Sequence, residues 1–345
     1  MPKRISTANR YGRASSVSRT GARRQRSGSI LPDILVTRRL PSSVLAKLRA
    51  AGSVDVFADA GTMPADELRN RIAGTDALVC VSTDRIDASA VDASSRLKVI
   101  ANVAVGYDNI DVAHARARGI VVTNTPDVLT DSVADFTWAL ILAITRRLAE
   151  GERLVRRGEW KGWAFDLLLG TELRGKQLGL VGVGRIGRAV AARAPAFGMK
   201  VAYSSRSEIN LPGAEAMSLD RLLLTSDVVS LHVPLTDATR HLIDKRALTR
   251  MKRSAYLINT GRGPVVDEEA LAWALQQHLL AGAALDVYEH EPKVDADLLK
   301  LENVLLVPHL ASGTTETRTA MADLAAENVL AVLAGRPPLT PVGHL

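Results

Sequence analysis

Three residues in the second half of the chain have side chains that suit hydride chemistry on a 2-oxo acid: Arg262, Glu291 and His309. The planar guanidinium of Arg262 can grip a substrate carboxylate at two points and polarise the neighbouring carbonyl. His309 can protonate the alkoxide that forms when a carbonyl is reduced, and Glu291 can favour the imidazolium that serves as the acid. Taken singly, each residue could equally be a solvated charge, a cap or an exposed side chain.

Each of these residues follows an apolar run of strand type. The runs are 256–259, 283–286 and 304–307, and each ends shortly before one of the three residues. In an open α/β sheet, ligands bind beyond the carboxyl ends of parallel strands. This placement favours one shared site.

The stretch 178–206 predicts a dinucleotide site next to them. A short apolar strand leads into Gly182, Gly184 and Gly187, and a helix and a second strand at 200–204 follow. The first glycine permits a tight turn, the second lets backbone approach a pyrophosphate, and the third allows close packing of helix and strand. The pyrophosphate would rest on the N–H groups at the start of the helix.

The end of the second strand bears on the choice of cofactor. An NAD site usually has an acidic residue there, which binds the ribose 2′-hydroxyl. Here Ser205 and Arg206 stand at that place, and no acid occurs before Glu208. A hydroxyl and a guanidinium suit a 2′-phosphate, so we expect NADP(H) to be preferred, with NAD(H) as the alternative; Arg206 could also merely face solvent.

The remaining sequence alternates short apolar strands with helical stretches, which indicates parallel α/β layers. Further strands are predicted at 33–37, 54–57, 76–81, 97–101, 120–123 and 227–232. We expect one long helix over 130–157 with Asp131 as a candidate N-cap. Pro195 should kink or end the helix after the glycines, and 314–334 should form a final amphipathic helix with no strand after it.

Composition separates the N-terminal tail from the rest of the 345 residues. Residues 1–29 hold eight basic residues, no acid and few apolar residues, so the net charge of +7 belongs to this tail. We expect a disordered extension or a start site placed too early; a transit-like segment and a nonspecific nucleic-acid arm are the alternatives. No apolar run is long enough to cross a membrane. The single cysteine, Cys80, excludes an internal disulfide and a thiolate metal cluster, and we expect no metal.

Five blocks of sequence resemble the D-isomer-specific 2-hydroxyacid dehydrogenases, and most closely their glyoxylate/hydroxypyruvate reductase branch. The blocks are VAVGYDNID, NTPDVLTDSVADFTWALILAITRR, NTGRGPVVDEEAL, AGAALDVYEHEP and NVLLVPHLASGTTETR. The resemblance covers residues 32–343. It implies that Arg262 binds and polarises the 2-oxo acid, that His309 is the acid/base, and that Glu291 keeps it protonated. It also implies that Val105 and Gly106 offer backbone N–H groups to the substrate carboxylate.

The resemblance further implies two Rossmann-like, doubly wound parallel-sheet domains with a cleft between them. A flavodoxin-like substrate domain would comprise 30–128 plus 312–345, and an NAD(P)-binding Rossmann domain would comprise 129–311. Closure of the domains over the ligand would exclude water. The expected cofactor contacts are Gly182, Gly184, Arg185, Ile186, Gly187, Ser205, Arg206, Pro234, Thr239, Thr260, Asp286 and Gly313.

Taken together, the sequence predicts a cytoplasmic, homodimeric, NADPH-dependent reductase of small 2-oxo acids, glyoxylate or hydroxypyruvate first, that acts without membrane or nucleic acid. Trp160 and Trp163 resemble a W-x-x-W element that lies near the dimer interface in related reductases, although they could simply pack the long loop. The chain departs from the family pattern at Ser82, where an aliphatic residue is usual, and at Ala311-Ser312-Gly313. The alternatives are a 2-ketogluconate reductase, a phosphoglycerate-type dehydrogenase and, from another class, an NAD(P)-sensing binding protein like the co-repressor relatives.

Overall fold

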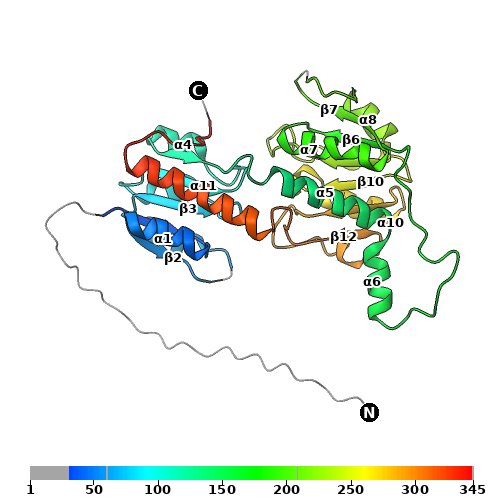
Figure 1. Cartoon of the computed structure of the whole chain (residues 1–345), viewed down its shortest axis with the longest axis horizontal. Coiled ribbons are helices and arrows are strands. Elements are labelled where there is room, and N and C mark those ends of the chain that lie inside the picture. The colour runs from blue at the N-terminus through cyan, green and yellow to red at the C-terminus, as the bar shows by residue number, and fades with distance from the viewer. Residues whose placement is uncertain (1–30, 60, 208, 344–345) are drawn as a thin grey trace, which may run out of the picture. The chain divides into compact units, whose positions relative to one another are not determined.

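The computed structural model describes residues 31–59, 61–207 and 209–343, and the basic segment 1–29 lies outside them. The described chain forms two separate sheets, and every strand pair in both is parallel (Figure 1). Within that part of the chain, no helix has the length and apolar character that a membrane span needs. The predicted α/β class with two parallel sheets is confirmed.

The first sheet has five strands in the order β2-β1-β3-β4-β5. This is the flavodoxin-like order, in which successive strands are added first on one side of β1 and then on the other. All five strands lie where the apolar runs predicted them: β1 (Asp33–Val36), β2 (Ser53–Val56), β3 (Ala77–Val81), β4 (Val99–Val103) and β5 (Val121–Thr123). The helices on their connections are α1 (Ser42–Ala51), α2 (Ala65–Ile72), α3 (Ala88–Asp92) and α4 (Val112–Ala117).

The second sheet has seven strands in the order β12-β11-β10-β9-β6-β7-β8. The glycine turn follows β6, which lies at the reversal point of this doubly wound sheet. Its strands are β6 (Gln177–Val181), β7 (Lys200–Ser204), β8 (Ala214–Ala216), β9 (Val228–Leu231), β10 (Tyr256–Asn259), β11 (Gly282–Leu285) and β12 (Val304–Leu306). Its connections carry α7 (Arg185–Arg193), α8 (Leu219–Thr225), α9 (Lys245–Arg250), α10 (Glu268–Gln276) and the short 3₁₀ turns η1 (Ala194–Phe197), η2 (Gly263–Val265) and η3 (Leu298–Lys300).

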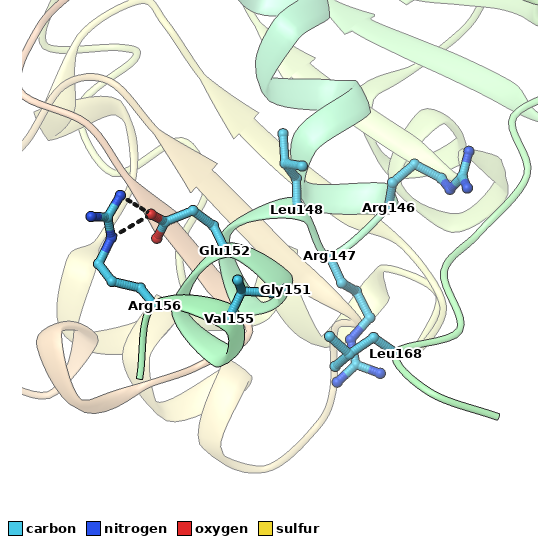
Figure 2. A pocket seen from close by; sticks show the side chains of 8 residues that line it. All are labelled: Arg146, Arg147, Leu148, Gly151, Glu152, Val155, Arg156 and Leu168. Carbon is cyan, nitrogen blue, oxygen red and sulfur yellow. Dashed lines mark hydrogen bonds and ion pairs between the residues drawn. The ribbon is translucent and has the colours of Figure 1, made fainter. Parts of the chain in front are cut away.

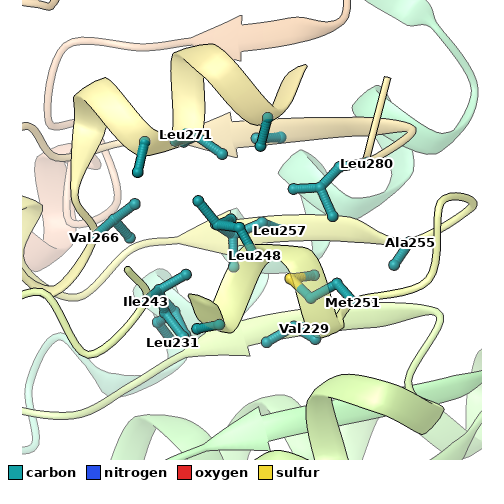
Figure 3. Close-up of a cluster of buried hydrophobic side chains, with 14 of the residues drawn as sticks. Val229, Leu231, Ile243, Leu248, Met251, Ala255, Leu257, Val266, Leu271 and Leu280 are labelled. Carbon is teal, nitrogen blue, oxygen red and sulfur yellow. The ribbon is translucent and has the colours of Figure 1, made fainter. Parts of the chain in front are cut away.

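Apolar side chains cover both faces of the second sheet. On one face, Leu231 and Leu257 pack against residues of α9 and α10 such as Leu248 and Leu271 (Figure 3). On the other face, Trp138 stacks on Phe197 with ring centroids 4.3 Å apart. A fully buried leucine contributes about 1.5–3 kcal/mol relative to an exposed one, so these layers hold the strand ends in place.

The last helix, α11 (Thr315–Leu333), returns to the first sheet. Its Ala322, Ala326 and Val329 are buried against Ile34 and Val79 of that sheet, and Figure 1 draws α11 beside β3. The predicted final helix is therefore confirmed. The chain leaves the first sheet after β5, builds the second sheet, and comes back.

The prediction of one long helix over 130–157 is wrong, because the structure has two helices there, α5 (Thr130–Thr145) and α6 (Leu148–Arg156). Arg147 between them adopts a left-handed conformation with φ of 53°. The carbonyl of Thr145 accepts a hydrogen bond of 2.8 Å from the backbone N–H of Thr171, so it does not continue the helical ladder. The hydrogen bond from Thr171 therefore ends α5.

Two smaller expectations about helix ends have opposite outcomes. Asp131 does not cap α5, since Leu129 stands at the N-cap and Asp131 instead pairs with Arg193 at 3.0 Å. Pro195 does end its helix: α7 stops at Arg193, and the proline is the second residue of the 3₁₀ turn η1 that follows.

Candidate active site

The predicted catalytic residues follow three strands that are neighbours in the second sheet. Arg262 follows β10, Glu291 lies on the loop after β11, and His309 follows β12. Because these strands are adjacent and parallel, their carboxyl ends share one edge of the sheet.

Glu291 and His309 are in direct contact. The Nδ1 atom of His309 lies 2.9 Å from Oε2 of Glu291, and the backbone N–H of Tyr288 donates to Oε1 at 3.1 Å. Burial acts to raise the pKa of Glu291, but the hydrogen bond and charge of His309, the Tyr288 N–H and the charge of Arg262 together lower it. The carboxylate is therefore kept ionised beside the imidazole, and its Nδ1 contact leaves Nε2 of His309 for a substrate oxygen.

A buried carboxylate shapes the turn that presents His309. The backbone of His309 is left-handed, with φ of 52°, a conformation that is strained for a residue with a side chain. Asp286, which is fully buried, accepts the backbone N–H of Leu310 at 2.5 Å and of Ala311 at 2.9 Å. Burial raises the pKa of Asp286 against the effect of these bonds. Asp286 was predicted to contact the cofactor, and here both of its carboxylate oxygens accept hydrogen bonds from the turn after His309.

Arg262 reaches the loop that follows β4 of the first sheet. Its Nε donates to Asp108 at 2.9 Å, and its Nη1 donates to the carbonyl of Gly261 at 2.9 Å. Gly106 lies so near that a Cβ placed on it would overlap the guanidinium. The predicted carboxylate-binding residues Gly106 and Arg262 are therefore side by side.

Several residues that hold these loops were not predicted from the sequence. Asn259 donates to the carbonyl of Arg262 at 3.0 Å and accepts the N–H of Gly261 at 3.1 Å. A Cβ on Gly263 would overlap the backbone of Tyr288, so the Arg262 loop packs directly on the Glu291 loop. These positions lie inside the quoted sequence blocks, but their contacts are with backbone atoms, which residue types alone do not indicate.

Glu268 at the start of α10 was missed in the same way. It is buried, accepts the backbone N–H of Glu289, and accepts the N–H of Asp295 at 3.3 Å. Burial is the main cause that raises the pKa of Glu268. This carboxylate anchors both ends of the loop that carries Glu291.

The glycine turn has the geometry that a dinucleotide needs. Gly182 has a φ of 91°, and a Cβ there would lie 2.8 Å from the carbonyl oxygen of His232. A Cβ on Gly187 would overlap the carbonyl of Gly182, so helix and turn are in close contact. At Gly184 no atom lies within 4 Å of a Cβ position, so the start of α7 is open to a phosphate group.

The other predicted cofactor residues lie around this edge of the sheet with different partners. Arg185 pairs with Asp127 at 2.6 Å, and Ile186 packs among the apolar residues near Leu129. The Thr239 hydroxyl donates to the Pro234 carbonyl at 2.7 Å and the Thr260 hydroxyl lies 3.0 Å from that of Thr137. The N–H of Gly313 donates to the Leu310 carbonyl at 2.6 Å. Ser205 and Arg206 are exposed just after β7.

Within the described ranges, no group of three or more His, Cys, Asp or Glu residues is placed to hold a metal ion.

Comparisons with known proteins show the family of this chain. Residues 138–311 match the D-isomer specific 2-hydroxyacid dehydrogenase, NAD binding domain, family. A glyoxylate reductase of Thermofilum pendens is 49% identical over 315 residues, which cover 89% of this chain and 93% of that protein. The crystal structure of the TT0316 protein of Thermus thermophilus is 48% identical with a TM-score of 0.86, over 90% of this chain and 100% of its own.

A third relative is a structure with ligands. It is the NADPH-dependent glyoxylate/hydroxypyruvate reductase of Sinorhizobium meliloti, whose crystal structure is a complex with NADP and malonate. It is 39% identical with a TM-score of 0.82, and the match covers 91% of this chain and 97% of that one. The chain belongs to the D-isomer-specific 2-hydroxyacid dehydrogenases, a family of oxidoreductases, and it is similar to glyoxylate reductases.

Proposed function

We propose that this chain reduces a small 2-oxo acid, glyoxylate or hydroxypyruvate, to the 2-hydroxy acid, with the D isomer formed from hydroxypyruvate and NADPH as the hydride source. The observation that carries the proposal is the joint placement of three groups. Arg262 lies against Gly106, its charge acts on Glu291, and Glu291 contacts His309 at 2.9 Å. A carboxylate grip and an acid/base are the groups that this reaction needs.

The roles of the residues follow from their chemistry. Two nitrogens of Arg262 bind the substrate carboxylate and polarise the neighbouring carbonyl, with help from the N–H groups of Val105 and Gly106. A reduced nicotinamide cofactor, held at the glycine turn, would supply the hydride for C2 of the substrate. His309 then gives a proton to the oxygen of the former carbonyl, and Glu291 stabilises the imidazolium before this transfer. One hydride and one proton convert the 2-oxo acid into the 2-hydroxy acid.

We infer a preference for NADP(H) over NAD(H) from the end of β7. Ser205 and Arg206 are exposed there, where a carboxylate would repel a 2′-phosphate. The relative from Sinorhizobium meliloti, which is named as NADPH-dependent, supports this inference. The rest of the cofactor site comprises the glycine turn and the residues from Pro234 to Gly313 that the sequence predicts.

We also propose the division into a substrate domain of 30–128 plus 312–345 and a cofactor domain of 129–311. The packing of α11 on the first sheet and of α5 on the second supports it. Closure of these domains would bring Arg262 and the loop after β4 around the substrate and exclude water.

We propose that two copies of the chain form a homodimer through the segment 148–169. The helix α6 has no buried residue, and Trp163 and Phe165 after it are 83% and 82% exposed. A pocket of about 650 Å³ lies on α6, and its lining includes Leu148, Val155 and Leu168 together with Glu152 and three arginines (Figure 2). An apolar surface of this kind marks an interface, and a second copy of the chain is the partner that we propose for it.

A screen of substrates and cofactors tests the reaction. We expect the purified full chain to oxidise NADPH with glyoxylate or hydroxypyruvate, more slowly with pyruvate and 2-ketogluconate, and with a higher kcat/KM for NADPH than for NADH. A clear preference for NADH would contradict the cofactor assignment. Faster turnover of 2-ketogluconate than of glyoxylate and hydroxypyruvate would favour a 2-ketogluconate reductase. Unchanged turnover after deletion of residues 1–29 would speak against a role of the tail in the reaction.

A further inference from the structure

The loop after β4 has three successive carbonyl groups that are all held by hydrogen bonds. The carbonyl of Ala104 accepts the backbone N–H of Thr125 at 2.9 Å. The carbonyl of Val105 accepts Nδ2 of Asn124 at 2.8 Å, and the carbonyl of Gly106 accepts Nδ2 of Asn102 at 2.8 Å. Two of the three donors are asparagine side chains that come from outside the loop.

Each of these hydrogen bonds also fixes the direction of the N–H group that shares a peptide plane with the bonded carbonyl. The peptide bonds of this loop are trans, so each N–H points opposite to the carbonyl of the same peptide plane. The N–H groups of Val105, Gly106 and Tyr107 therefore point away from the bonded carbonyls. Within the residues that the structure describes, none of the three donates a hydrogen bond.

One of the two asparagines is itself firmly held. Asn102 is fully buried, and its Nδ2 also donates to Oδ1 of Asn109 at 3.1 Å. Asn109 in turn donates to the carbonyls of Val81 and Asp84, at 3.1 and 2.9 Å, at the end of β3. The amide of Asn102 is thus fixed by a network that ties the ends of β3 and β4 together.

The guanidinium of Arg262 lies at the same loop. It is in contact with Gly106, and its Nε is bonded to Asp108, the next residue but one along the loop. Successive backbone N–H groups in a bent segment form a concave site for an anion, and a guanidinium beside them adds a charged donor. A carboxylate is the planar anion that such a set of donors fits.

We propose that Asn102 and Asn124 are positioning residues for substrate recognition: they aim the N–H groups of Gly106 and Tyr107 at the carboxylate of the 2-oxo acid. The proposal rests on the proposed function and deepens it, because it adds the Tyr107 N–H to the donors and assigns the orientation of the loop to two amide side chains. Neither asparagine touches the substrate. Each acts through the peptide plane whose carbonyl it binds.

The replacements Asn124→Asp and Asn102→Asp test this inference. Aspartate keeps the shape of the side chain but cannot donate to the loop carbonyl, so the peptide plane loses its restraint. We expect the KM for glyoxylate or hydroxypyruvate to rise about tenfold or more in each variant, with kcat changed much less, because binding of the carboxylate is weakened in ground state and transition state alike. The Kd for NADPH, measured by fluorescence, should stay at the wild-type value.

Asn303→Asp is the matched control, because Asn303 also donates to a backbone carbonyl, that of Leu275 at 3.3 Å, but at the start of β12. It should leave the KM unchanged. Asn124 is only partly buried, so Asn124→Asp decides the question if Asn102→Asp fails to fold.

The outcomes separate this inference from the proposed function. A KM within twofold of wild type in Asn124→Asp, while the wild type reduces a 2-oxo acid, overturns the inference and leaves the proposed function intact. Equal losses in KM and in NADPH affinity would show a general distortion and would also overturn it. Absence of turnover in the wild type overturns both.

Discussion

The proposed acid/base chemistry of the site depends on the ionised carboxylate of Glu291. It accepts hydrogen bonds from the imidazole of His309 and from the backbone N–H of Tyr288, and Arg262 adds a favourable charge. These contacts outweigh burial and hold the pKa of Glu291 below its ordinary value of 4.5. The contacts that would prepare His309 for the proposed proton transfer therefore also stabilise the fold.

The first prediction follows from this depressed pKa. The stability that ionised Glu291 contributes is fully present above about pH 4.5 and is lost as the pH falls through the lower pKa of the folded chain. Urea unfolding at a series of pH values should show a free energy of unfolding that drops more steeply below pH 4.5 in the wild type than in Glu291→Gln. Glu269 is exposed, so Glu269→Gln is the control. Its free energy of unfolding should depend on pH as that of the wild type does. Parallel curves for wild type and Glu291→Gln would contradict the pairing.

The second prediction concerns the space beside Arg262. A methyl group at position 106 would overlap the guanidinium, which is the flexible end of a side chain and can move. Gly106→Ala should therefore lower kcat/KM for the 2-oxo acid by about 10²-fold, because a shift of about 1 Å in a binding group has that effect, while the melting temperature changes little. Steady-state kinetics and thermal unfolding check this, and a variant that folds normally and keeps full activity would contradict the placement of Arg262.

At the scale of elements, the site is built where loops after adjacent strands press on each other. Gly263 lies against the backbone of Tyr288, and Glu268 of α10 accepts N–H groups from the loop that carries Glu291. The sheet supplies a common edge, and these contacts set the distance between the loops after β10 and β11. The geometry of the pair Glu291 and His309 thus depends on residues outside the proposed catalytic set.

The third prediction follows from the contact at Gly263. A Cβ there would meet backbone atoms of Tyr288 and Glu289, which cannot move without displacing the loop. Gly263→Ala should lower the free energy of unfolding by about 1–3 kcal/mol, the range for overpacking of an interior, and should lower kcat as well. Gly61→Ala, at a position with nothing within 4 Å of a Cβ, is the matched control and should change neither quantity. An unaltered unfolding curve for Gly263→Ala would refute this role.

These elements also show which parts of the fold the sequence could predict. Strand β3 is a continuous apolar run, and β10 is apolar up to its last residue, Asn259. Both strands and the polar residues that follow β10, Arg262 among them, were therefore predictable. The break at Arg147 was not, because it depends on a hydrogen bond from Thr171, which is distant in sequence. The short edge strand β8 was missed because it is mostly exposed and has no apolar run.

The same limit applies to the candidate site. His309 and Glu291 could be named from their types and from the family pattern. Asn259, Gly263 and Glu268 could not, since each acts by contact with backbone atoms of a loop that the fold brings close. Residue type predicts chemistry, but it does not reveal which backbone group a side chain will meet.

At the scale of the whole molecule, the chain leaves an apolar segment uncovered. Trp163, Phe165 and Leu148 are exposed around α6, whereas both sheets have clusters of buried apolar residues on each face. A surface of this kind is costly in water unless a partner covers it. The proposed homodimer would cover it.

The fourth prediction tests that assembly. Analytical ultracentrifugation should find the wild type as a dimer and Trp163→Glu with Phe165→Glu as a monomer, because two charges would have to be buried without partners. Leu299→Glu, at an apolar residue that is 65% exposed elsewhere on the second sheet's connections, should remain a dimer. A monomeric wild type, or a dimer that both charges leave intact, would contradict the interface.

The proposed reaction is tested most directly by the kcat/KM for NADPH-dependent reduction of glyoxylate and hydroxypyruvate, measured side by side for the wild type and Arg262→Ala. The wild type should turn over at least one of these acids, with a D-2-hydroxy acid as the product from hydroxypyruvate. Arg262→Ala should lower kcat/KM by about 10²-fold or more, because two charge-assisted hydrogen bonds to the carboxylate disappear. A wild type that reduces no 2-oxo acid, or an Arg262→Ala variant as active as the wild type, would refute the proposed function.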